Sequence, residues 1–488
     1  MNHGYLSEPG STNSGDDYSA FTAKILLGLI LVFSLLVRLP ALNHGPFGID
    51  SWNYCIGALK YHIAHPPGYA GYVALGALLN LFVHHINRTF IGISLLSALG
   101  AVALVFCLGR LMGLKNKTCL AAAVTYSLSL SGLVFSVLAL NYMLEGCLAL
   151  MFACLAIVAI QRRSISAGFA ATIVFAASGC IRPTTTYFLI PLWLYFLWRM
   201  RPRVIACFMH ILLAGLLIGA WQYANSHLLA RAGFQGSSFD FQVMMPVGYD
   251  YVSLNNRLAT TREAQPAFHM PGFEILAWTL NQLHLKLMPH GENWPQPSLR
   301  RAGMLSGIQF LKLCYSLVFS VPALLVLPFT FHRAADDGTF ARHRWFLLWW
   351  IGPAFLFFIF GHLGSYGYLL FFQPAVVIWL TQRLFESERR GNTLKLVYAS
   401  AALFALGFFL LARPFQADSG WRRTADILAL ASTAASIRDG YSVSRNAPPG
   451  PMTPAYRAMI DAASDKDFLE AAQRANYTPI PQVGTQKE

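Results

Sequence analysis

The stretch Gly92–Leu108 reads GISLLSALGAVALVFCL and contains no charged residue. The runs Ile25–Val37 and Ala401–Ala412 have the same character. A helix needs about 20 mainly apolar residues to cross the hydrocarbon core of a bilayer, and these runs with their apolar flanks approach that length. The sequence therefore predicts an all-α, multi-pass integral membrane protein.

The overall composition points the same way. Of the 488 residues, 55% are hydrophobic and only 12% are charged, whereas a soluble globular protein carries about 25% charged residues. The net charge of +14 could indicate nucleic-acid binding, but the Lys and Arg residues lie in short clusters between apolar runs. Such clusters are typical of topology determinants that face anionic headgroups. We therefore expect the lipid bilayer as a partner, and we do not expect the protein to bind nucleic acid.

The basic residues also predict which segments cross the membrane. The apolar segments are roughly 24–38, 67–83, 90–109, 118–138, 144–160, 166–180, 184–198, 204–222, 307–330, 345–361, 367–382 and 394–412. If 67–83 lies along the membrane surface and the others cross, most Lys and Arg residues fall inside, as the positive-inside rule requires. Segment 67–83 follows Pro66 and is short for a span. We therefore predict a bundle of about eleven transmembrane helices with extracytoplasmic juxtamembrane helices.

This topology divides the chain into three parts. Residues 1–23 form a cytoplasmic tail, 24–412 the transmembrane domain, and 413–488 a small extracytoplasmic segment. Within the transmembrane domain, 39–89 and 223–306 are the outer loops large enough for chemistry. No internal repeat relates the two halves, which weighs against many secondary transporters.

Asp50 is the only carboxylate of the outer loop 39–89, and Trp52 and Tyr54 follow it closely. A single acid near apolar surface can serve as a general base, because desolvation raises its pKa toward a useful value. The alternative interpretation is structural: Asp50 or Ser51 caps a helix that runs from Trp52 to Tyr61. The residues alone leave both interpretations open.

His65-Pro66-Pro67-Gly68-Tyr69 is the second feature of this loop. The prolines fix an extended approach and Gly68 allows a tight turn before the following helix. His65 is thereby held near a helix start, whose free N–H groups favour an anion. His65 is a candidate contact for a phosphate, or else an interfacial residue of a loop-to-helix junction.

The order of these features resembles the bacterial GT-C glycosyltransferases, which relate to the dolichyl-phosphate-mannose–protein mannosyltransferases and the lipid A aminoarabinose transferases. The resemblance extends to Gly179-Cys180-Ile181-Arg182-Pro183 and to the run from Gly361 to Leu370, GHLGSYGYLL, and covers most of residues 24–412. It implies an enzyme that takes a sugar from a polyprenyl-phosphate carrier and places it on an acceptor at the outer face of the membrane.

Carried over by position, the resemblance assigns Asp50 as the catalytic residue that activates the acceptor hydroxyl, and His65 as a neighbour of the donor phosphate. Glu145 resembles a second-loop carboxylate that faces the same site. Several relatives have Asp-Glu in the first loop, whereas Ser51 follows Asp50 here. This departure disfavours a divalent metal held by two carboxylates, so no metal ligand and no cofactor are predicted.

A lipid-linked phosphate must meet cations at the depth of the interface, where they would stabilise the leaving group. The candidates that face outward in the predicted topology are Arg182, Arg300, Arg301, Lys312 and His362. The three arginines can also be simple headgroup anchors, whereas a lysine inside a span is costly without a function. Tyr366 and Tyr368, near His362, fit an aromatic belt.

The sequence thus favours an inverting glycosyltransferase with Asp50 as general base, located in a bacterial inner membrane with its site facing the periplasm or the outside. One alternative is a polymerase or ligase that acts on polyprenyl-diphosphate glycans. Another is a transporter or flippase of lipid-linked sugars. The sugar and the acceptor, whether glycan, lipid or protein, are not encoded in any readable motif.

Overall fold

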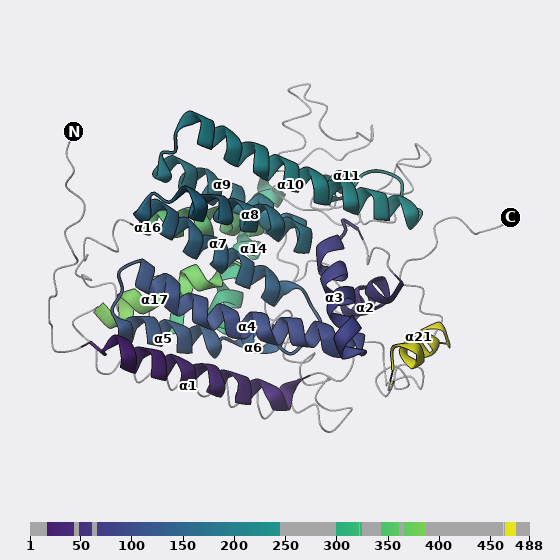
Figure 1. The fold of residues 1–488 in the computed structure, drawn as a ribbon, viewed down its shortest axis with the longest axis horizontal. Coiled ribbons are helices and arrows are strands. Elements are labelled where there is room, and N and C mark those ends of the chain that lie inside the picture. Colours follow the sequence, from purple (N-terminus) through teal and green to yellow (C-terminus); the bar gives the residue numbers. More distant parts are fainter. Residues whose placement is uncertain are drawn as a thin grey trace.

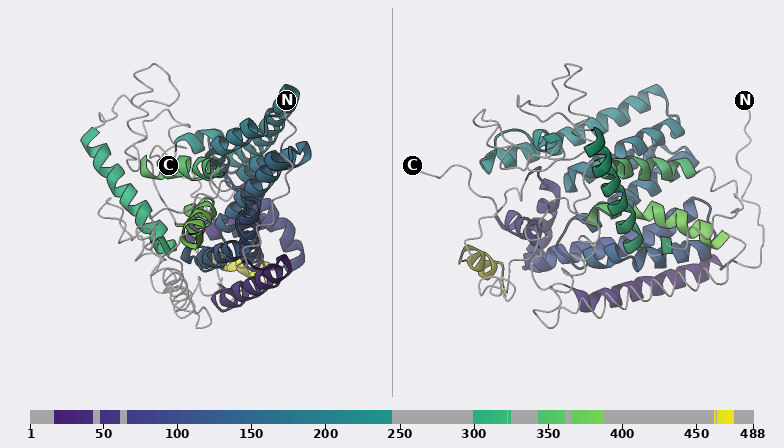
Figure 2. Two further views of the ribbon diagram at one scale, coloured as in Figure 1. Left: turned by 90° about the vertical axis from the view of Figure 1, so that its left-hand side faces the viewer. Right: turned by 180° about the vertical axis from the view of Figure 1, so that it is seen from behind.

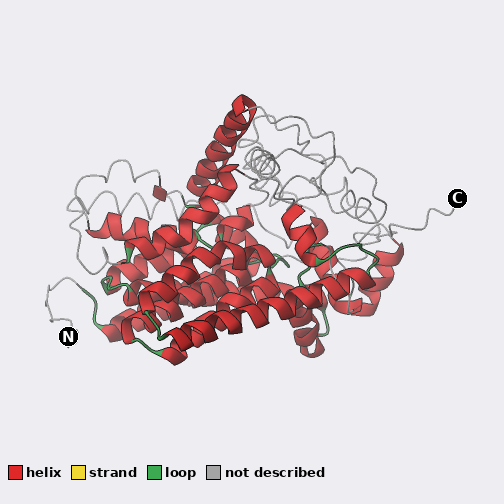
Figure 3. Ribbon diagram, turned by 90° about the horizontal axis from the view of Figure 1, so that it is seen from above, coloured by secondary structure: helices red, strands yellow, loops and turns green. Residues whose placement is uncertain are grey.

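The computed structural model describes residues 17–42, 48–60, 66–244, 299–321, 323–324, 343–360, 366–386, 462 and 464–474. Every regular element in these ranges is helical, and they contain no strand (Figure 3). The predicted span 394–412, most of the outer loop 223–306 and most of the C-terminal segment lie outside the described residues.

The first half of the chain forms a continuous series of helices. They are α1 (Ala20–Arg38), η1 (Leu39–Ala41), α2 (Gly48–Lys60), α3 (Ala70–Val83), α4 (Ile86–Leu111), α5 (Asn116–Ser127), α6 (Leu130–Phe135), α7 (Tyr142–Arg162), α8 (Ile165–Ile181), α9 (Pro183–Met200), α10 (Val204–Arg231) and α11 (Ser238–Met244). The later elements are α14 (Leu299–Ser320), α16 (Arg344–Phe360), η4 (Tyr366–Leu369), α17 (Gln373–Glu386) and α21 (Asp465–Arg474).

The long helices of the first half of the chain run side by side, with α7 packed against both α4 and α8, and α10 packed against α8 (Figure 1). The shorter helices α2, α3, α11 and α21 gather at one end of this bundle, and α3 lies steeply across its direction (Figures 1 and 2). We call this the α2–α3 end of the bundle. It joins segments from both halves of the sequence.

Local sequence explains where the helices turn back. Ser164 begins α8, because its hydroxyl accepts the backbone N–H of Ala167. Arg163 ends α7 in the left-handed conformation, and Pro183 occupies the first position of α9, where its missing N–H costs nothing. Each turn between α7, α8 and α9 is therefore short, and neighbouring helices are antiparallel.

Within the described residues, four helices are long and apolar enough to cross a membrane: Ala20–Ala41, Ile86–Leu111, Tyr142–Arg162 and Val204–Arg231. The segments Ala70–Val83, Ile165–Ile181 and Arg344–Phe360 are apolar but shorter. On α1 and α10, large apolar side chains face outward, such as Phe21 at 73% and Val204 at 86% exposure. Water disfavours such faces and lipid does not, so the chain is a membrane protein.

Some predicted segments differ in detail. Segment 118–138 is two helices, α5 and α6, because Ser129 interrupts the first and caps the second by accepting the N–H of Gly132. Segment 367–382 begins as the 3₁₀ turn η4 before α17 starts at Gln373. The helix predicted to lie on the surface, α3, has 14 residues, fewer than the roughly 20 that a span needs. The total of about eleven spans and the sidedness of the bundle stay predictions.

Candidate functional site

Several segments that are distant in the sequence meet at the α2–α3 end of the bundle. They are the first two turns of α2, residues 66–69, the start of α7, the junction between α8 and α9, and η4. The predicted residues Asp50, Tyr54, Glu145 and Arg182 lie on these segments. We call the polar side chains of this region the Arg182 cluster: Asp50, Tyr54, Tyr69, Tyr142, Glu145, Arg182, Thr185 and Tyr368.

Asp50 lies inside the first turn of α2, which begins at Gly48. The helix therefore starts before both residues proposed as its cap, so that interpretation is wrong for Asp50 and Ser51. The Ser51 hydroxyl instead donates to the carbonyl of Ala139 at 2.8 Å and holds α2 on the bundle. Asp50 is half-buried, and a carboxylate in a first turn is favoured by the helix dipole.

Tyr54 and Tyr69 share an environment with Asp50. Their rings meet edge to face, with centroids 5.3 Å apart. Burial raises the pKa of Tyr69; Arg182 opposes this rise and the Asp50 carboxylate adds to it. Burial is also the main cause that raises the pKa of Tyr54. Tyr69 and Asp50 raise this pKa further, and Arg182 lowers it. Both phenols therefore stay protonated at neutral pH, and both respond to the charges of Asp50 and Arg182.

The loop 66–69 is held in place by α10 and α11. Gly68 has φ +103°, and a Cβ atom there would lie 2.6 Å from Oδ1 of Asn225, so only glycine fits. The same Asn225 Oδ1 accepts the backbone N–H of Ala70 at 3.0 Å. The hydroxyl of Ser238 donates to the carbonyl of Pro67. These contacts bear out the tight turn expected at Gly68, and they fix Tyr69 at the edge of the cluster.

Arg182 stands in extended conformation between α8 and α9, with φ −152° and ψ 113°. The local sequence favours this conformation, since a proline disfavours the helical region for the residue before it. Its guanidinium carbon lies 3.9 Å from the ring centre of Tyr368 and 4.9 Å from that of Tyr142. Gly367 allows the backbone of η4 to lie against the Tyr142 ring, because a Cβ atom at this position would lie 2.4 Å from that ring. Arg182 is thus held by two aromatic rings.

Glu145 holds the guanidinium from another side. Its Oε2 lies 3.0 Å from NH1 of Arg182, and Thr185 donates a hydrogen bond to Oε1. Both carboxylate oxygens are therefore engaged, and Glu145 and Arg182 are both buried. Removing one partner of such a buried pair typically costs about 3–5 kcal/mol, because the other charge is left uncompensated. In this arrangement Glu145 orients Arg182.

The remaining nitrogens of Arg182 have a different surrounding. Within the described part of the chain, only NH1 makes a hydrogen bond, so Nε and NH2 have no protein acceptor there. This edge of the guanidinium can bond an oxygen of a ligand. A guanidinium edge suits phosphate and carboxylate oxygens, which it can bind with two parallel N–H bonds.

The other predicted residues lie elsewhere or outside the described ranges. Arg300 is exposed in the first turn of α14, away from any contact that would assign it a ligand. Arg301 and Lys312 lie on α14, where only their backbone is described. His65 and His362 lie outside the described residues. Their proposed roles stay predictions.

Sequence reasoning missed Tyr142, Thr185 and Tyr368 as members of the cluster. Tyr368 was assigned to an aromatic belt, and nothing in the motif around Arg182 indicates that Tyr142 would cover it. Their closeness in sequence to the predicted residues could have indicated them. Thr185 lies two residues after Pro183, and Tyr142 precedes Glu145 by about one helical turn. Among the described residues, no three His, Cys, Asp or Glu side chains gather as metal ligands do.

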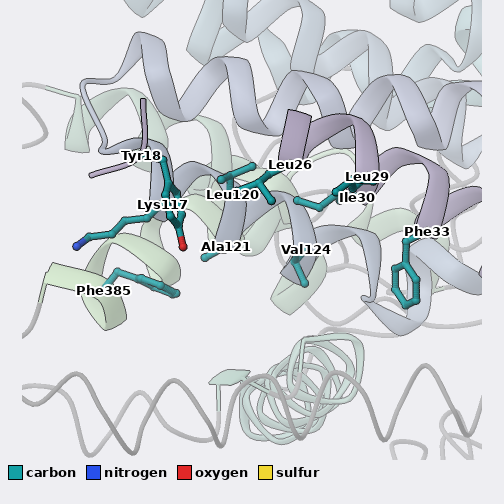
Figure 4. A pocket seen from close by; sticks show the side chains of 10 residues that line it. All are labelled: Tyr18, Leu26, Leu29, Ile30, Phe33, Lys117, Leu120, Ala121, Val124 and Phe385. Carbon is teal, nitrogen blue, oxygen red and sulfur yellow. The ribbon is translucent and has the colours of Figure 1, made fainter. Parts of the chain in front are cut away.

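A separate hollow lies between α1 and α5, and Figure 4 shows its lining, with Leu29, Ile30 and Phe33 on α1 and Lys117, Leu120 and Val124 on α5. None of the predicted site residues lines it. Its walls are almost entirely aliphatic and aromatic, so it offers no convergent polar groups for catalysis.

No family model matches this sequence, and no curated protein is detectably similar to it. Two solved structures of the oligosaccharyltransferase of Archaeoglobus fulgidus are partly similar in shape. The apo form gives a TM-score of 0.46 at 14% identity and covers 96% of this chain and 61% of that chain. The form tethered to an acceptor peptide gives 0.44 at 13% identity with the same coverage. This chain spans less than two thirds of their length, and scores this low assign neither family nor function.

Proposed function

We propose that this protein is a membrane glycosyltransferase that moves a sugar from a polyprenyl-phosphate carrier to an acceptor hydroxyl, with inversion at the anomeric carbon. The observation that carries the proposal is the Arg182 cluster. It combines a half-buried carboxylate, Asp50, with a guanidinium whose Nε and NH2 edge has no acceptor in the described chain. A base and an anion-binding cation in one site are what such a transfer requires.

The reaction balances with these two groups. Asp50 takes the proton of the acceptor hydroxyl as its oxygen forms a bond to the anomeric carbon. The bond between the anomeric carbon and the phosphate oxygen breaks, and its electron pair leaves with the polyprenyl phosphate. Arg182 stabilises the negative charge that grows on that phosphate, and Glu145 and Tyr368 hold Arg182 in place.

The membrane position of the cluster supports a lipid-linked donor. Asp50 lies on α2 and Arg182 at the junction of α8 and α9, at the α2–α3 end of a bundle of apolar helices. If the exposed apolar faces of α1 and α10 contact the lipid chains, this end lies at the depth of the headgroups. By the predicted topology this end faces the periplasm or the outside of a bacterial inner membrane. His65, Lys312 and His362 remain candidates for further phosphate contacts.

The test uses purified protein in lipid with a panel of polyprenyl-phosphate sugars and crude membrane acceptors. It measures the release of free polyprenyl phosphate. Wild-type protein is expected to release it, and Asp50→Asn to reduce the rate by about 10²–10⁴-fold, the usual contribution of a general base. The matched control is Asp17→Asn, which neutralises a carboxylate that bonds the backbone at the start of α5, outside the Arg182 cluster.

Two results would overturn the proposal. Equal rates for Asp50→Asn and wild type would remove Asp50 as the base. If no donor releases polyprenyl phosphate but polyprenyl-diphosphate glycans are turned over, the chain is a polymerase or a ligase. If a lipid-linked sugar crosses the membrane without bond cleavage, the chain is a flippase.

A further inference from the structure

The C-terminal helix α21 docks on the corner formed by α2, α3 and α4 (Figure 1). Asp465, its first residue, accepts a hydrogen bond from Nδ2 of Asn80 at 2.6 Å and from the backbone N–H of Ile86 at 2.8 Å. Asn80 belongs to the last turn of α3 and Ile86 is the first residue of α4. One carboxylate therefore ties the turn between two helices to a helix almost four hundred positions later.

These bonds satisfy groups that the turn itself leaves open. The N–H of Ile86 is one of the free donors at the start of α4, and a carboxylate there also meets the positive end of the helix dipole. Oδ1 of Asn80 accepts the hydroxyl of Thr89 at 2.9 Å, so its Nδ2 is directed at Asp465. The network is continuous from α3 through α4 to α21.

A second contact joins α21 to α2 itself. Phe468 stacks on Trp52 with ring centroids 5.4 Å apart and an angle of 24° between the planes. Both side chains are buried, Trp52 at 5% and Phe468 at 3% exposure. On an α-helix, residues four apart share a face and residues two apart do not. Asp50 and Tyr54 therefore share the face toward the Arg182 cluster, while Trp52 presents another face to α21.

We propose that α21 is a strap that fixes the position of α2, with Asp465 and Phe468 as positioning residues for Asp50. The bundle holds one side of α2 through Ser51 and Ala139, and α21 holds another through Trp52. With both sides held, Asp50 keeps its place beside Tyr54 and Tyr69 in the Arg182 cluster. The catalytic consequence rests on the proposed function, whereas the docking of the strap does not.

An exchange of side chains tests the strap. Asn80→Asp places a second carboxylate against Asp465 and should release α21. The double variant Asn80→Asp with Asp465→Asn restores every bond: residue 465 then donates to residue 80 and still accepts the N–H of Ile86, and Thr89 still has its acceptor. Phe468→Ala removes the stack on Trp52. Lys466→Ala, on the exposed side of α21 with a side chain 85% exposed, is the matched control.

The first readout is hydrogen exchange of the backbone amides of residues 48–60, which needs no activity. We expect faster exchange in Asn80→Asp and Phe468→Ala, and wild-type exchange in the double variant and in Lys466→Ala. Unchanged exchange in both disrupting variants would overturn the strap, even if the protein proved not to be a transferase.

The second readout is transfer kinetics. A displacement of about 1 Å in a catalytic group can cost about 10²-fold in rate, so kcat should fall by about 10–10²-fold while KM for the donor changes little. The double variant should recover kcat. A fall in kcat without recovery in the double variant, or an equal change in kcat and KM, contradicts a positioning role. Absence of activity in the wild type refutes the proposed function and leaves the exchange result to decide the strap.

Discussion

The described part of the molecule contains two buried arginines, each at the end of a helix, and their surroundings differ. Arg38 ends α1 and Arg182 follows the end of α8, and both side chains are withdrawn from solvent. Arg38 is saturated by neutral oxygens: Nε donates to Ser136, NH1 to the hydroxyl and carbonyl of Ser34, and NH2 to the carbonyl of Ser127. Arg182 has a carboxylate partner and two aromatic rings.

The difference separates a structural arginine from a functional candidate. Every nitrogen of Arg38 makes a hydrogen bond: NH1 bonds Ser34 within α1, while Nε and NH2 join α1 to the ends of α6 and α5. The positive charge of Arg38 lies at the negative end of α5. Glu145 accepts a hydrogen bond from NH1 of Arg182, and the rings of Tyr142 and Tyr368 cover the guanidinium. The edge formed by Nε and NH2 of Arg182 has no acceptor among the described residues. A buried arginine is therefore not functional simply because it is buried. A functional candidate also keeps N–H donors that no protein acceptor occupies.

Among the two arginines and their neighbours, the largest effect should come from Arg182. Arg182→Met is expected to lower the transfer rate by about 10²–10³-fold, the typical cost of removing one donor that stabilises transition-state charge. It should also lower the free energy of unfolding by about 3–5 kcal/mol, since Glu145 is left uncompensated. Transfer assays and thermal unfolding in detergent measure the two effects.

A double variant separates these contributions. Arg182→Met with Glu145→Leu removes both charges and should restore stability while the rate stays low. Wild-type rates in this double variant would place Arg182 with Arg38 as a structural residue.

Tyr368 should give an intermediate effect. Its ring faces the Arg182 guanidinium at 3.9 Å, and such a contact contributes about 0.5–2 kcal/mol. Tyr368→Leu should therefore raise KM for the donor or lower kcat by about 2–30-fold, whereas Tyr368→Phe keeps the ring and should behave nearly as wild type. Steady-state kinetics of the three proteins decide this. A loss in Tyr368→Phe equal to that in Tyr368→Leu would show that the hydroxyl, and not the ring, matters.

The smallest effect on activity should come from Arg38. Arg38→Met leaves buried acceptors on Ser34, Ser127 and Ser136 without their donor, at about 1–3 kcal/mol for each group left unsatisfied. The unfolding temperature should fall, while the transfer rate per folded molecule stays at the wild-type value. The comparison between the two arginines fails if Arg38→Met loses transfer activity at unchanged stability.

Part of the candidate site was predictable because it depends on neighbours in the chain. Pro183 disfavours the helical region for Arg182, and Gly68 supplies the positive φ of its turn. Asp50 stood out as the only carboxylate of its loop. The error at the start of α2, predicted at Trp52 and found at Gly48, is of the usual size, since helix boundaries read from sequence shift by about two to four residues.

The sequence by itself determined that the chain is a membrane protein made of helices, because long apolar runs are stable in lipid whatever their neighbours are. It also determined the local shape around Arg182 and Gly68. Only the tertiary structure decided that Glu145, Tyr142 and Tyr368 surround Arg182 while serines surround Arg38, and that α21 packs against Trp52. These choices depend on which helices lie side by side, and a contact between distant segments leaves no periodic signal in either segment.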